Sequence, residues 1–280
     1  KSLVVPRTIK NVNSIVRMLS SSTNLKNDSG DKMNEEERYL FDLWGYVVIE
    51  NVLSVGQLTT LNQLIDQRNF PTPTEDIQSQ RFGGFFDWEK DDFRHLLNHG
   101  RITPLLKEII GPKFRLDHTY GILMTKGNMG GNLHGGGEPY DPAQYYVFKN
   151  GWMYNGLTVV SWALTDALSD QGGFCCIPGS HKSNVRRPSS FTPVKSNPKC
   201  MVSVHQKAGD VVIFTEALTH GTLPWNATHP RRSILIKYSP GHLSWGHGRY
   251  SDDLRRKMES EDQRLMLEPP YVSNRKVVVE

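Results

Sequence analysis

A histidine surrounded by glycines is the first feature of the chain that could form a chemical site. Residues 130–146 read GGNLHGGGEPYDPAQYY, so His134 lies among five glycines, and Glu138 and Asp141 follow at short range. A glycine cluster costs backbone entropy on folding and therefore needs a reason. A phosphate-binding loop fits poorly, because neither a GK[ST] motif nor an expected helix follows. The stretch is therefore either a surface loop or a metal-ligand loop.

A second histidine, His220, follows the apolar run DVVIF, which is an expected buried strand. Taken alone, each histidine is more readily explained by a structural role. Non-haem Fe(II) oxygenases, however, hold iron with two histidines and one carboxylate and leave the other side of the metal open. A co-substrate such as 2-oxoglutarate then needs an arginine, because a guanidinium matches a carboxylate through two hydrogen bonds. Arg231 opens the next expected strand, where Arg232 is expected to face the other way because strand residues alternate.

Other kinds of catalytic site find less support in the sequence. The PGSH stretch is not a G-x-S-x-G nucleophile elbow, and no Cys or His pair has the spacing of a closed zinc site. The three cysteines, Cys175, Cys176 and Cys200, cannot all pair, and adjacent cysteines rarely bridge each other. A reduced, intracellular setting is the simplest interpretation.

The expected elements give an α+β chain that is mainly β. Helices are expected from Glu35 to Asp42, after the capping residue Ser54, and twice within residues 91–112. Short β-rich runs separated by Gly, Pro, Asp and Asn follow, which is typical of a sandwich or barrel. The pattern predicts helices packed outside a β core, in a single domain over residues 33–280.

Residues 1–32 differ from the rest in composition. They contain basic, serine and apolar residues with no acid before Asp28, which fits either a disordered tail or an organellar transit segment. The protein is accordingly expected to be cytoplasmic, or mitochondrial or otherwise organellar if that segment is a transit peptide. The net charge of +4 is spread along the chain, so no nucleic-acid partner is expected. No apolar run approaches the ~20 residues of a membrane span.

Four motifs, taken in order, resemble the phytanoyl-CoA dioxygenase-like (PhyH) family of Fe(II)/2-oxoglutarate-dependent oxygenases. They are FDLWGYVVIENVLS, GGFCCIPGSHK, AGDVVIFTEALTHGT and PRRSILIKYSPG. The resemblance covers nearly the whole chain after residue 33 and implies a double-stranded β-helix, or jelly roll. It also implies a dioxygenase that oxidises a C–H bond of a small organic substrate and releases succinate and CO2.

By this resemblance, His134 and His220 bind iron, while Arg231 and Thr222 bind 2-oxoglutarate. Trp162 matches a family tryptophan that lines the co-substrate pocket; simple core packing is the competing interpretation. The catalytic set is therefore His134, His220 and Arg231, with Fe(II) as the metal and 2-oxoglutarate and O2 as co-substrates. Neither the oligomeric state nor the identity of the substrate follows from the sequence.

The chain departs from the family at one position. The first family motif is His-x-Asp, but Gly136 stands in place of the aspartate. Glu138 is taken as the replacement ligand, with Asp141, water and chloride as alternatives. Chloride in that position would make the protein a halogenase, and loss of iron binding would leave a ligand-binding jelly roll without turnover. Hydroxylation is favoured, because oxidation is the commoner outcome in this class.

Overall fold

The computed structural model describes residues 32–71, 79–137, 139–192, 194–246 and 248–279. Residues 31–280 form one compact unit. The predicted N-terminal tail, residues 1–32, lies outside the described residues except for Lys32.

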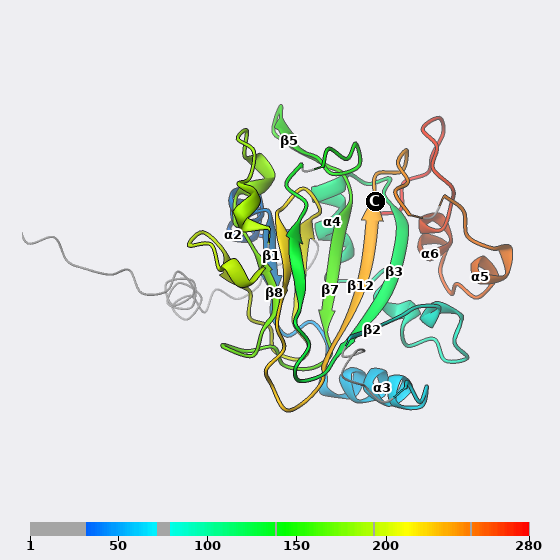
Figure 1. The fold of residues 1–280 in the computed structure, drawn as a ribbon. Coiled ribbons are helices and arrows are strands. Elements are labelled where there is room, and N and C mark those ends of the chain that lie inside the picture. Colours follow the sequence, from blue (N-terminus) through cyan, green and yellow to red (C-terminus); the bar gives the residue numbers. More distant parts are fainter. Residues whose placement is uncertain (1–31, 72–78, 138, 193, 247, 280) are drawn as a thin grey trace, which may run out of the picture. The chain divides into compact units, whose positions relative to one another are not determined.

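Two antiparallel sheets form the centre of this unit (Figure 1). The larger sheet has the strand order β1-β10-β7-β12-β3-β2, the smaller sheet has the order β4-β11-β8-β9, and β5 pairs with β6 as a hairpin. The strands are β1 (Tyr46–Ile49), β2 (Ser79–Phe82), β3 (Arg115–Met124), β4 (Gly131–His134), β5 (Tyr146–Lys149), β6 (Trp152–Asn155), β7 (Thr158–Ala163), β8 (Gly173–Cys176), β9 (Val202–Ser203), β10 (Val211–Thr215), β11 (His220–Leu223) and β12 (Arg231–Ser239). The predicted double-stranded β-helix is confirmed.

The first helix extends to Trp44, two residues past its predicted end, and the helix predicted after Ser54 is confirmed, whereas the first helix expected within residues 91–112 is a 3-10 helix, Arg94–Leu96. Asn34 and Ser54 each form a capping box with the residue three positions on, and Gly45 ends the first helix with φ 81°. The α-helices are α2 (Glu35–Trp44), α3 (Val55–Asp66), α4 (Thr103–Ile110), α5 (Asp252–Arg256) and α6 (Glu261–Met266). The 3-10 helices are η1 (Phe85–Asp87), η2 (Arg94–Leu96), η3 (Ser180–Lys182), η4 (Ser189–Phe191) and η5 (Val194–Ser196).

The two faces of the larger sheet have different neighbours. Ile234 and Ile236 of β12 lie on the outer face, where they join the core cluster that includes side chains of α2, α3, α4 and α6. Leu235 points the other way and packs with Phe174 of the smaller sheet. Alternation along β12 therefore separates a helix-covered outer layer from an inner layer between the sheets.

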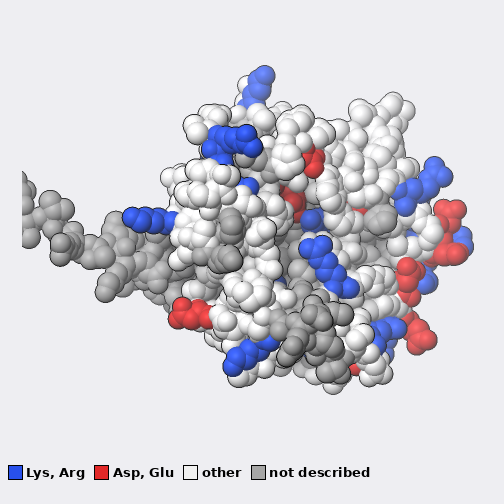
Figure 2. All heavy atoms as spheres, viewed as in Figure 1, with Lys and Arg blue, Asp and Glu red and all other residues white. Residues whose placement is uncertain are grey.

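Charges of both signs are interspersed on the face of the molecule drawn in Figure 2. Lysine and arginine side chains stand beside aspartate and glutamate side chains at the right-hand edge of that view. Among the described residues, no helix is both long enough and apolar enough to cross a membrane.

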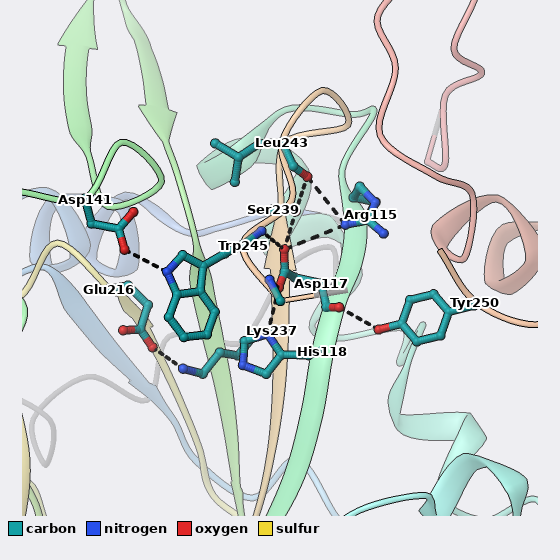
Figure 3. Close-up of polar contacts among 11 residues, drawn as sticks. Arg115, Asp117, His118, Asp141, Glu216, Lys237, Ser239, Leu243, Trp245 and Tyr250 are labelled. Atoms are coloured by element: carbon teal, nitrogen blue, oxygen red, sulfur yellow. Dashed lines mark hydrogen bonds and ion pairs between the residues drawn. The ribbon is translucent and has the colours of Figure 1, made fainter. Parts of the chain in front are cut away.

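A buried carboxylate fixes the segment that follows β12 (Figure 3). Asp117 of β3 accepts hydrogen bonds from the backbone N–H groups of Trp245 and Gly246, each at 2.7 Å. The Nδ1 atom of His118 lies 2.7 Å from the same carboxylate. Burial raises the pKa of Asp117, but these hydrogen bonds outweigh burial and bring the pKa below its ordinary value of 3.8. Trp245 is thereby held beside β3 and β12.

Replacing Asp117 with asparagine tests this anchor. A carboxylate whose pKa is lower in the folded state stabilises the fold above its unfolded pKa of 3.8 and loses that contribution as the pH falls below it. Asp117→Asn should lower the free energy of unfolding at pH 7 by about 1.5–3 kcal/mol. Urea unfolding at a series of pH values should show the difference from the parent shrinking below that pKa. An equal difference at all pH values would contradict the account.

Candidate metal centre

Strand pairing between β4 and β11 brings the two candidate histidines together. His134 ends β4, His220 begins β11, and the two residues are direct partners in the antiparallel register. Their ring centroids lie 4.2 Å apart. The His220 ring also packs against Phe214, with 4.9 Å between ring centroids, so it lies on the inner side of the sandwich.

Both imidazoles are oriented in the same way. The Nδ1 atom of His134 lies 3.0 Å from the carbonyl oxygen of Asn132, and that of His220 lies 2.7 Å from the carbonyl oxygen of Leu218. A carbonyl only accepts, so each Nδ1 carries the hydrogen and each neutral ring keeps a lone pair on Nε2. Burial lowers the pKa of His220 to about 4, which favours the neutral ring. Hydrogen-bonded Nδ1 and free Nε2 are the arrangement of histidines that ligate metals.

A carboxylate that the sequence did not single out completes the cluster. Ligand atoms of His134, Glu216 and His220 all lie within 4.8 Å of one another. One Glu216 oxygen, Oε2, lies 3.9 Å from His220 Nε2, and the other, Oε1, lies 2.6 Å from Lys237 Nζ. Burial raises the pKa of Glu216, but the charge and hydrogen bond of Lys237, together with the two neighbouring histidines, outweigh burial, so the net pKa lies below its ordinary value. The site therefore holds two imidazoles and one ionised, buried carboxylate.

Lys237 belongs to the inner layer as well. It reaches from β12 to Glu216 in Figure 3, close to Trp245. Its ammonium lies 5.5 Å from the ring centroid of Tyr120 and 5.7 Å from that of Trp245. The Trp245 ring in turn stacks on His118 with 5.3 Å between centroids. These aromatic side chains surround the charged end of Lys237 and line the inner face next to Glu216.

The other two carboxylates suggested by the sequence are placed differently. Glu138 lies outside the described residues. Asp141 accepts a hydrogen bond from Trp245 Nε1 at 2.7 Å and another from the backbone N–H of Ala143 at 2.8 Å. Asp141 is therefore tied to the Trp245 segment and is not among the residues that the structure gathers around His134 and His220. A further group, Asp91, His95 and Glu259, lies at the surface away from this cluster.

The glycines next to His134 lie against the turn that carries Glu216. Gly135 and Gly136 have φ of 75° and 73°, in the left-handed region. A Cβ atom on Gly135 would lie 2.7 Å from the carbonyl oxygen of Glu216, and one on Gly136 would lie 2.2 Å from Thr219 Oγ1. Both the backbone conformation and the close contacts favour glycine at these two positions.

Arg231 is a buried cation without a carboxylate partner among the described residues. Its Nη1 donates to the sulfur of Met124 at 3.4 Å, and its Nε has no hydrogen-bond partner. Burial lowers its pKa to about 10. Gly173 makes room for it, since a Cβ there would lie 3.2 Å from Arg231 Nε. The neighbouring Arg232 faces the other way and binds Asp66 of α3 at 2.5 Å.

Thr222 and Trp162 have contrasting positions. Thr222 follows His220 by two residues, so it lies on the same face of β11, and it pairs with Phe174. Trp162 lies on the outer face of the larger sheet, where its fully buried ring is 5.4 Å from that of His99. This position fits core packing, the competing interpretation, and a role of Trp162 in a co-substrate pocket stays a prediction. The strand is buried on both faces, and its side chain packs in the helix-covered layer.

A jelly roll with paired histidines and a carboxylate at adjoining strand ends defines a double-stranded β-helix protein with a candidate mononuclear metal centre. The chain belongs to the phytanoyl-CoA dioxygenase (PhyH) family, whose profile matches residues 41–233. The predicted family resemblance is confirmed. A search among curated proteins found no match.

Solved structures of similar fold include HygX and the epimerase SnoN. HygX from Streptomyces hygroscopicus, with nickel and 2-oxoglutarate bound, is 24% identical, with a TM-score of 0.68 and coverage of 80% of this chain and 94% of HygX. HygX with nickel, 2-oxoglutarate and hygromycin B bound gives a TM-score of 0.66 at 23% identity and the same coverage. The epimerase SnoN, in complex with Fe3+, alpha ketoglutarate and nogalamycin RO, is 16% identical, with a TM-score of 0.59 and coverage of 86% and 96%. These likenesses establish the shared fold.

Two neighbouring glycines provide a matched test of the loop. Gly136 and Gly137 have nearly equal φ, 73° and 76°, but nothing lies within 4 Å of a Cβ on Gly137. Gly137→Ala should cost about 1–2 kcal/mol of stability from the left-handed backbone alone. Gly136→Ala should cost about 1–3 kcal/mol more, because its methyl group overlaps Thr219. Chemical denaturation of both variants checks this, and equal losses would contradict the close contact.

Proposed function

We propose that the protein is an Fe(II)/2-oxoglutarate-dependent oxygenase that hydroxylates a C–H bond of a small organic substrate. The observation that carries this proposal is Arg231, a buried guanidinium with no carboxylate partner among the described residues. An unpaired buried charge is costly, so its retention calls for an anion that arrives from outside the chain. The distal carboxylate of 2-oxoglutarate is such an anion, and a guanidinium binds it through two parallel hydrogen bonds.

The position of Arg231 relative to the histidines supports a dicarboxylate. Leu223, at the far end of β11 from His220, pairs with Gly173, the residue that faces Arg231. Strands rise about 3.3 Å per residue, so this end of β11 is about 10 Å from His220. A dicarboxylate can reach a metal at His220 with one end and Arg231 with the other. Thr222 lies between them on the same strand and offers a hydroxyl to the same ligand.

The donor set also fits Fe(II). Two neutral imidazoles with a nearby ionised carboxylate are the ligands of non-haem iron oxygenases. When bound, iron and 2-oxoglutarate activate O2 for oxidation of a C–H bond, with succinate and CO2 as co-products. The backbone contacts of Nδ1 leave Nε2 of His134 and His220 free to bind the metal, and burial keeps the guanidinium of Arg231 away from bulk water.

The aromatic side chains near Glu216 orient the substrate. Trp245 is half exposed, stacks on His118 and is tied to Asp141 and Asp117 by hydrogen bonds. A rigidly held aromatic ring next to a metal site can position a substrate for reaction. Since the similar fold in SnoN belongs to an epimerase, product assays should follow inversion at carbon as well as hydroxylation.

The adjacent arginines provide a matched test of co-substrate binding. Arg231→Met should weaken 2-oxoglutarate binding about 100-fold, since it removes a charge-assisted bidentate contact worth roughly 3 kcal/mol. Without ligand, Arg231→Met should be at least as stable as the parent, because it removes an unpaired buried charge. Arg232→Met should leave 2-oxoglutarate affinity unchanged and cost about 1–2 kcal/mol of stability, because it removes the ion pair with Asp66 and a partly buried hydrogen bond to Asn62.

Calorimetric titration of the Mn(II)-loaded protein with 2-oxoglutarate, in the presence and in the absence of oxygen, measures these affinities. His220→Ala should abolish the metal-dependent part of the binding. Failure of the parent to bind Mn(II) and 2-oxoglutarate, or equal affinity in the two arginine variants, would reject the oxygenase and leave a ligand-binding jelly roll. Chlorinated product in the presence of chloride would instead identify a halogenase.

A further inference from the structure

An aspartate is disfavoured at Gly136, the position where the family resemblance leads us to expect a metal-binding aspartate. Gly136 has φ 73°, and a Cβ there would lie 2.2 Å from Thr219 Oγ1. An aspartate would therefore meet backbone strain and a steric clash together. Glycine at this position lets the backbone of the loop pack directly against the turn from Glu216 to Thr219.

We propose that the carboxylate ligand has moved to this turn and that Glu216 is the third protein ligand of the iron. The assignment rests on the proposed function, since it concerns the same metal. Glu216 is buried, and its Oε2 lies 3.9 Å from the Nε2 atom of His220. Its carboxylate groups with both histidines, whereas Asp141 is bonded to Trp245 and Ala143. The glycines that exclude the aspartate also let the His134 loop approach the turn that supplies its replacement.

Lys237 acts as a positioning residue for this ligand. It binds Oε1 of Glu216 at 2.6 Å and leaves Oε2 on the side of the histidines. The carboxylate is thereby directed to bind the metal through one oxygen. Three protein ligands of this kind would leave the other side of a bound metal open for co-substrate.

A purely structural role for the Glu216–Lys237 pair explains less of the observed geometry than a metal-binding role for Glu216 does. A buried ion pair contributes little net stability, and apolar residues of similar volume often serve as well. The pair also stands beside two histidines whose Nδ1 atoms are already satisfied by backbone carbonyls. With Glu216 on the metal, no vacated carboxylate position is left for chloride, so the relocation favours hydroxylation over halogenation.

Metal binding by charge-altered variants tests the assignment without reference to turnover. Mn(II) affinity is measured by electron paramagnetic resonance titration, and Co(II) absorption spectra report the ligand set. Glu216→Gln should weaken Mn(II) binding by about 100-fold or more, beyond the effect typical of residues that only support a ligand, and should change the Co(II) spectrum. Glu138→Gln and Asp141→Asn should bind Mn(II) within threefold of the parent.

The variant Lys237→Met tests whether Glu216 is a metal ligand or only the salt-bridge partner of Lys237. If Glu216 is a ligand, Lys237→Met destabilises the metal-free protein by leaving a buried carboxylate unpaired, and Mn(II) restores much of the lost thermal stability. Should Glu216→Gln fail to fold, the double variant Glu216→Gln with Lys237→Met removes both charges and must still show the loss of Mn(II) affinity.

Retention of parental Mn(II) affinity in Glu216→Gln or in the double variant would overturn the assignment, as would loss of binding in Glu138→Gln or Asp141→Asn. These results differ from failure of the proposed function. In that case the parent itself does not bind Mn(II), or His220→Ala binds it as the parent does.

Discussion

The close backbone contact between the His134 loop and the turn before His220 is the constraint on which the site depends. Glycines at 135 and 136 allow the loop to lie against the carbonyl oxygen of Glu216 and the side chain of Thr219. The register of β4 with β11 then makes His134 and His220 direct partners. A side chain at either glycine would push the loop from the turn and separate the two imidazoles. One packing contact thus determines both the distance between the histidines and the approach of Glu216.

The space between the two sheets also contains buried charged side chains. Glu216, Lys237 and Arg231 are all largely shielded from water, and only the first two neutralise each other. Because an ionised group loses hydration on burial, each must be compensated by a partner or by a ligand. The layer between the sheets is therefore less stable than an apolar core would be. That cost is expected where a protein is shaped to receive a metal and an anionic co-substrate.

Much of the fold and part of the site could be predicted from the sequence. The cap at Ser54 located one helix, and the motif order pointed to the jelly roll, His134, His220 and Arg231. Glu216 was missed because it stands at the end of a buried apolar strand, and only the fold shows it beside His134. The face on which Trp162 lies could not be predicted from the sequence either. Its strand is buried on both faces, so apolar and polar residues do not alternate along it. Gly136, where the resemblance leads one to expect aspartate, suggested a changed ligand set, and only the backbone conformation offers a reason for glycine there.

An anaerobic crystal structure with Fe(II) and 2-oxoglutarate tests the central claim most directly. It should show iron bound by Nε2 of His134, Nε2 of His220 and one oxygen of Glu216, with Lys237 still on the other oxygen. The distal carboxylate of 2-oxoglutarate should lie against the guanidinium of Arg231. Iron held by Glu138, Asp141 or chloride, with Glu216 bound only to Lys237, would contradict the account.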